Sequence, residues 1–150
     1  MKSTKLIYML QQAHAIEIGA YEAYYGHANA SKDPEAKRRI KEIQQDELDH
    51  KLNVGFMLHE LGGKNNEVMD SLLYFIGRSI SLICYIMVKR AANWGAKIME
   101  VMGADEYRKL AFEARAQGYY KMALTLDDMQ KAEKDHEEFF KWSLGSEEIV

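Results

Sequence analysis

The chain has 150 residues, which suits one domain with a sizeable core, so a single domain is expected over 1–150. A formal net charge of −3 and a pI near 6.0 show no excess of positive charge of the kind that binds nucleic acid, and we exclude that class of partner. The single cysteine, Cys84, cannot form an internal disulfide, and we expect a buried thiol in a cytoplasmic protein. One proline and many good helix formers predict an all-α fold.

The first helix is expected to begin near Ser3 or Thr4, either of which can cap it, and to run to about Ala30; the second is expected from Pro34 to Leu61. Positions at helical spacing along the inner face of the first helix are apolar except for Glu17. Between the helices, Asp33 is a residue type favoured at the N-cap, and Pro34 suits the first helical position. These signals predict a helical hairpin with one carboxylate on its inner side.

The second helix carries the pattern Glu47-x-x-His50, whose two side chains share one helical face because they are three residues apart. The rest of that face is apolar: Ile40, Ile43, Val54, Met57 and Leu61. Residue 32, in the turn, lies midway in sequence between Glu17 and Glu47. In an antiparallel hairpin both would stand about 22 Å from the turn, at one level.

Residues 71–88 are mostly apolar, with Arg78 as the only charge. Eighteen residues meet the lower limit for a membrane-spanning helix. Arg78, together with Ser79 and Ser81, instead favours a buried crossover helix. Shallow contact of this segment with a membrane surface is the alternative that stays open.

From residue 89 the helical pattern continues to a turn at Gly118, and three acids compete for the inward position. The stripe through Glu106 and Glu113 carries further charge and is typical of a solvated face. Glu100 precedes Gly118 by nearly the same interval in sequence as Glu133 follows it, so these two acids are close in level. We therefore expect Glu100 to point inward.

The last helix is expected over 119–144, with Gly145 as its stop and frayed residues beyond it. It repeats the earlier pattern as Glu133-x-x-His136. The other positions on the same face are again apolar: Tyr119, Met122, Leu126, Met129 and Phe140.

The inward polar residues amount to one Glu from each of two helices and a Glu-x-x-His from each of the other two. They are Glu17, Glu47, His50, Glu100, Glu133 and His136. This arrangement is the signature of di-iron and di-manganese carboxylate bundles. Four carboxylates in an apolar seam repel and are costly to desolvate, and two divalent cations would cancel their charge. Oxygen-rich ligands with one imidazole per metal suit two iron ions, with manganese as the alternative. Buried Glu–His salt bridges without metal are the competing interpretation.

The spacing of the motifs also predicts the topology. The second helix ends roughly three turns after His50, whereas the stretch from Asn66 to Glu100 is about three times as long in sequence. A short turn cannot absorb that excess, but a long crossover through 71–88 can. The predicted fold is a ferritin-like four-helix bundle with one long crossover that contains an extra apolar helix.

The chain resembles the ferritin-like superfamily over nearly its whole length. The spacing of Glu17, Glu47-x-x-His50 and Glu100, with Tyr107 seven residues later, resembles the demethoxyubiquinone hydroxylases. The stretch Ala114-Arg115-Ala116-Gln117-Gly118-Tyr119, followed by Glu133-Lys134-Asp135-His136-Glu137, is similar to rubrerythrins. The chain departs from the hydroxylases at Glu106, where they usually carry His. It departs from rubrerythrins because one cysteine cannot build a rubredoxin iron site.

The resemblance implies a di-iron oxidoreductase that activates O2 or peroxide, with a quinone-like apolar substrate, an external electron donor and a homo-oligomeric state. Tyr21, Tyr24 and Tyr107 lie near the ligand level and could pass electrons, although core packing is the commoner role of such tyrosines. The alternatives are a stand-alone rubrerythrin-like peroxidase, an iron storage or detoxification protein, and a metal-free helical interaction protein. Two symmetric Glu-x-x-His motifs argue against a storage ferritin.

Overall fold

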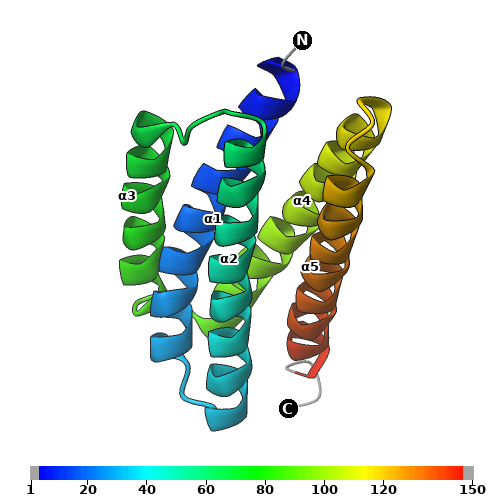
Figure 1. The fold of residues 1–150 in the computed structure, drawn as a ribbon. Coiled ribbons are helices and arrows are strands. Elements are labelled where there is room, and N and C mark those ends of the chain that lie inside the picture. Colours follow the sequence, from blue (N-terminus) through cyan, green and yellow to red (C-terminus); the bar gives the residue numbers. More distant parts are fainter. Residues whose placement is uncertain (1–3, 147–150) are drawn as a thin grey trace. The chain divides into compact units, whose positions relative to one another are not determined.

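The computed structural model describes residues 4–146, and all regular secondary structure in that range is α-helical (Figure 1). The five helices are α1 (Thr4–Ala30), α2 (Pro34–Glu60), α3 (Glu67–Cys84), α4 (Lys89–Ala116) and α5 (Tyr120–Ser146). The all-α prediction is therefore confirmed. The chain divides into two compact units, Met1–Ile86 and Met87–Val150, and each is described by itself. The single domain and the ferritin-like bundle stay predictions.

In the first unit, α1 and α2 form an antiparallel hairpin whose turn has the predicted chemistry (Figure 1). Asp33 is the N-cap of α2, and its Oδ1 accepts hydrogen bonds from the backbone N–H groups of Glu35 at 2.9 Å and Ala36 at 3.3 Å. Pro34 occupies the first turn, where no N–H is needed. At the other end, Gly62 takes a positive φ of 66° and ends α2 one residue before the predicted position.

The third helix packs against α1 through small residues. A Cβ added at Gly77 would lie 2.9 Å from Cα of Gly19 and closer still to its carbonyl oxygen. A Cβ added at Gly26 would overlap the backbone and hydroxyl of Ser81. The backbones of α1 and α3 therefore approach so closely that only glycine fits at these contacts.

The predicted buried crossover helix is only partly correct, because most of the α3 surface is exposed. Its buried residues are Gly77, Ser81 and Cys84, the small ones that face inward. Large apolar side chains project outward instead, with Phe75 and Leu82 each 67% exposed. Burial raises the pKa of the Cys84 thiol, in agreement with the expected buried cysteine. None of the helices in the described range 4–146 is both long and apolar enough to cross a membrane.

Polar pairs connect α3 to the rest of the first unit at its N-terminal end and in its second half. Nδ1 of His14 lies 3.0 Å from Oδ1 of Asp70, and Nε2 of the same ring lies 3.2 Å from Nδ2 of Asn65. Further along, Arg78 donates to a carboxylate oxygen of Glu22 at 3.3 Å. The orientation of α3 is thus determined by glycine contacts together with directional polar contacts.

In the second unit, α4 and α5 form another antiparallel hairpin (Figure 1). Its turn uses Gly118 at a φ of 82°, and Arg115 pairs with Asp127 across the hairpin. Helix α4 is continuous through Gly103. The predicted stop at Gly145 is wrong, because α5 continues to Ser146: one glycine near a helix end costs too little to terminate it. The predicted fraying concerns residues that lie outside the described range.

Candidate metal centre

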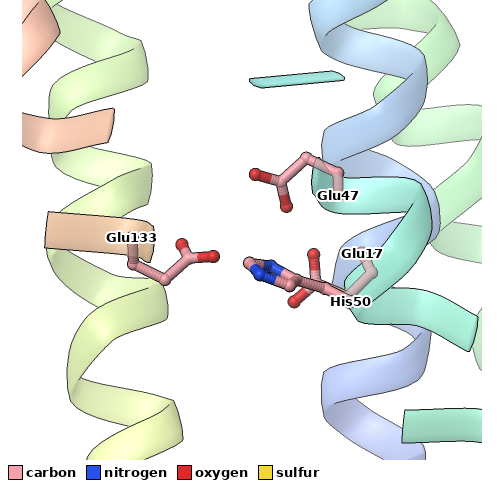
Figure 2. Close-up of side chains that lie close together, drawn as sticks. All are labelled: Glu17, Glu47, His50 and Glu133. Carbon is pink, nitrogen blue, oxygen red and sulfur yellow. The ribbon is translucent and has the colours of Figure 1, made fainter. Parts of the chain in front are cut away.

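The first unit brings together the three ligands predicted for it. Glu17 comes from α1, while Glu47 and His50 lie one turn apart on α2. Each offers a donor atom, and these atoms lie within 4.8 Å of one another. Figure 2 shows the two carboxylates and the imidazole directed to one region beside the hairpin; it also labels Glu133, which belongs to the second unit. Glu17 and Glu47 therefore stand at one level along the hairpin, as predicted.

The second unit brings together the other three. Glu100 comes from α4, while Glu133 and His136 come from α5, and their donor atoms again lie within 4.8 Å of one another. Nδ1 of His136 lies 3.2 Å from Oε2 of Glu100. Each unit thus carries two carboxylates and one imidazole, arranged as one Glu on one helix and a Glu-x-x-His on the next.

These separations are compatible with shared coordination of an ion. With donors at about 2.1 Å from an octahedral ion, neighbouring donor atoms stand about 3.0 Å apart and opposite ones about 4.2 Å apart. The His136–Glu100 separation of 3.2 Å matches neighbouring donors. Carboxylate oxygens combined with one imidazole form a donor set that suits iron or manganese. Both groups of buried residues could hold a metal ion.

All six side chains are withdrawn from solvent. Their residues are between 1% and 5% exposed. Glu47 Oε1, His50 Nδ1 and Glu133 Oε1 make no hydrogen bond among the described residues, although all three residues make other interactions. Burying two carboxylates in each unit is costly unless their charge is offset, and one divalent cation per unit has the required charge.

The choice among the three acids of α4 is settled by burial. Glu100 is 2% exposed, whereas Glu106 and Glu113 are half-buried. Asp105, the neighbour of Glu106, has a side chain that is 44% exposed and that pairs with Arg108 and Lys109, as expected toward the solvated side of the helix. The prediction that Glu100 points inward is confirmed.

The three predicted tyrosines differ in their surroundings. Tyr24 and Tyr107 are 2% and 1% exposed, whereas Tyr21 is half-buried. Tyr24 follows Glu17 by seven residues, and Tyr107 follows Glu100 by the same interval. Seven residues place each ring about 10 Å along the helix from the corresponding carboxylate. Tyr24 also stacks on the ring of His27, with centroids 6.3 Å apart.

One residue beside the predicted ligands was missed as a functional position. Gly103 is three residues after Glu100, and the carboxylate of Glu133 lies directly against it. The sequence signal was a glycine in the middle of a helix on the same face as a predicted ligand.

Comparison with protein-family models, with curated proteins and with solved structures gives no match.

Proposed function

We propose that the six residues hold two iron ions and that the chain is a di-iron oxidoreductase that activates O2 or peroxide. The observation that carries this proposal is that, in each unit, donor atoms of one Glu and of a Glu-x-x-His lie within 4.8 Å of one another. This separation is compatible with binding to one ion. An iron pair would supply electrons to O2 or peroxide. The buried position of all six donors supports a role for the chain in keeping bulk water away from that chemistry.

The residues of the chain have separate roles in this proposal. Glu17, Glu47, Glu100 and Glu133 would balance the metal charge, and His50 and His136 would each donate one ring nitrogen. Tyr24 and Tyr107 are buried near these ligands and could carry an electron between the centre and an external donor. An apolar, quinone-like substrate is the proposal suggested by the resemblance to the hydroxylases.

A stand-alone peroxidase of the rubrerythrin type is the second candidate, because the segment around Gly118 and the last Glu-x-x-His favour it. A single-turnover experiment separates the two. Protein loaded anaerobically with Fe²⁺ is mixed with either peroxide or air-saturated buffer, and oxidation is followed by absorbance. Faster oxidation by peroxide, by at least tenfold, is expected of a peroxidase. Rapid oxidation by O2 is expected of an oxygenase, and failure to react with either contradicts both.

We also propose that the outer face of α3 contacts the surface of an anionic lipid bilayer. This face, defined here as Val68, Leu72, Phe75 and Leu82, is at least 57% exposed at each position. Small residues inward and large apolar residues outward are the distribution found where helices pack in lipid. Exposed Lys89 and Arg90 follow the helix and provide positive charge for acidic headgroups.

The bilayer contact is tested by sedimentation of the intact protein with phospholipid vesicles. Wild-type protein should sediment with vesicles that contain phosphatidylserine, and a Phe75→Asp/Leu82→Asp variant should lose most of that binding. Leu124→Asp, an exposed leucine on α5, is the matched control and should retain it. If the double variant binds as well as wild type, or if its change is a loss of self-association instead, the lipid proposal is wrong.

A further inference from the structure

Gly103 occupies an unusual position for a glycine. It lies in the interior of α4, several turns before the helix ends at Ala116, where Gly is less favourable than Ala by about 1 kcal/mol. Its conformation does not explain the choice, since the positive φ values among the described residues occur at Gly62 and Gly118. The reason must lie in what a side chain at this position would contact.

The space beside Gly103 is filled by a carboxylate. A Cβ added there would overlap Oε2 of Glu133 and would lie 3.1 Å from Cδ and 3.6 Å from Cγ of the same side chain. These are the three nearest atoms, so the added methyl group would meet the end of Glu133 first. Both residues belong to the second unit, and Glu133 is 4% exposed.

The first unit provides an internal comparison. Ala20 follows Glu17 by three residues, as Gly103 follows Glu100, and Ala20 is buried. A methyl group is therefore present at the corresponding position of α1. In α4 the methyl is missing where the carboxylate of Glu133 lies against the helix.

From this contact we infer that Gly103 is a positioning residue for Glu133: by lacking a side chain it lets that carboxylate stand where it can bind metal. The inference rests on the proposed metal-binding function. When a methyl group is added, the helix backbone resists movement, whereas the end of a Glu side chain can rotate. The expected consequence of Gly103→Ala is a displaced carboxylate in an intact helical hairpin.

The expected effect separates metal binding from folding. Gly103→Ala should weaken metal affinity about 10- to 100-fold, the range seen when residues that orient a ligand are changed. The metal-free variant should melt no lower than wild type, because alanine favours the helix. Gly95→Ala is the matched control: it lies in the same helix, and an added Cβ there meets nothing within 4 Å.

The experiment is an anaerobic titration of the full chain with Co²⁺, followed by visible absorption, with melting of each variant with and without the ion. Gly103→Ala should require more Co²⁺ and show an altered spectrum, while Gly95→Ala should match wild type in Co²⁺ affinity and in spectrum. Glu133→Asp, whose carboxylate is shorter by one methylene, should weaken binding in the wild-type background but cost little or nothing in Gly103→Ala. This dependence is a coupling between the two positions.

The outcomes distinguish a failure of the positioning role from a failure of the proposed metal-binding function. If wild-type protein takes up no metal, the proposed function fails. If wild type binds metal and Gly103→Ala binds it equally well with the same spectrum, the positioning role is wrong. A Gly103→Ala variant that loses stability equally with and without Co²⁺ has a packing defect alone, and this result also overturns the inference.

Discussion

Replacing Glu47 or Glu133 with Gln should make the metal-free protein more stable and should abolish its stabilisation by Fe²⁺. Both carboxylates are at most 4% exposed, and each shares its unit with a second buried carboxylate. Removing one negative charge reduces the repulsion between the carboxylates and the cost of their desolvation. The free energy of unfolding of the metal-free protein should therefore rise by on the order of 1 kcal/mol or more. The same change removes a charged ligand, so the ion binds weakly.

The loss on the metal side should be the larger effect. A ligand present at 100 times its Kd stabilises the fold by about 2.7 kcal/mol per site. In a chain of this length, that corresponds to a rise in Tm of roughly 5–10 °C. Wild-type protein should show this rise when Fe²⁺ is added anaerobically, and both variants should show little or none.

The matched control is Glu60→Gln, which removes an exposed carboxylate from the same helix as Glu47. It should leave both the metal-free Tm and the Fe²⁺-dependent rise unchanged. The account is contradicted if the two buried variants melt below wild type without metal and still gain the full rise with Fe²⁺. That pattern would indicate buried salt bridges as the main role of these acids.

The second large effect is expected at Gly77, where α3 meets α1. An alanine there would place its Cβ 2.9 Å from Cα of Gly19, which is backbone and cannot rotate away. The helices must separate, and such overpacking costs about 1–3 kcal/mol, occasionally more. Chemical denaturation of Gly77→Ala should show this loss, in contrast to Gly95→Ala, which should gain up to about 1 kcal/mol.

The result at Gly77 also bears on the outer face of α3. If the helix separates from α1, thiol reagents should reach Cys84 faster, because this buried thiol lies on the inner face of α3. An unchanged denaturation midpoint together with unchanged Cys84 reactivity would show that α3 does not pack on α1 through these glycines.

Much of the secondary structure followed from local signals. Asp33 and Pro34 define the start of α2 because a cap and a proline act on their own backbone, independently of distant contacts. The inner faces of α2 and α5 were predictable because apolar residues repeat at helical spacing around Glu47 and Glu133. The choice of Glu100 followed from charge on the competing faces.

The features that were missed depend on contacts between helices. Hydropathy identified 71–88 as apolar, but it could not show that Gly77 and Ser81 face α1 and that Phe75 therefore faces outward. In the same way, Gly103 follows Glu100 by three residues and so shares its helical face, yet its contact with Glu133 depends on how two helices are rotated against each other. Side-chain type indicates what can be buried, and packing decides which face is buried.

The most direct test of the central claim is the iron content and magnetic state of the protein. The protein is loaded anaerobically with Fe²⁺, freed of excess metal and then oxidised. The proposal predicts two iron ions per chain that, after oxidation, are antiferromagnetically coupled in Mössbauer spectra and silent in EPR. Fewer than two ions, or two ferric ions that show no coupling, would contradict a shared di-iron centre.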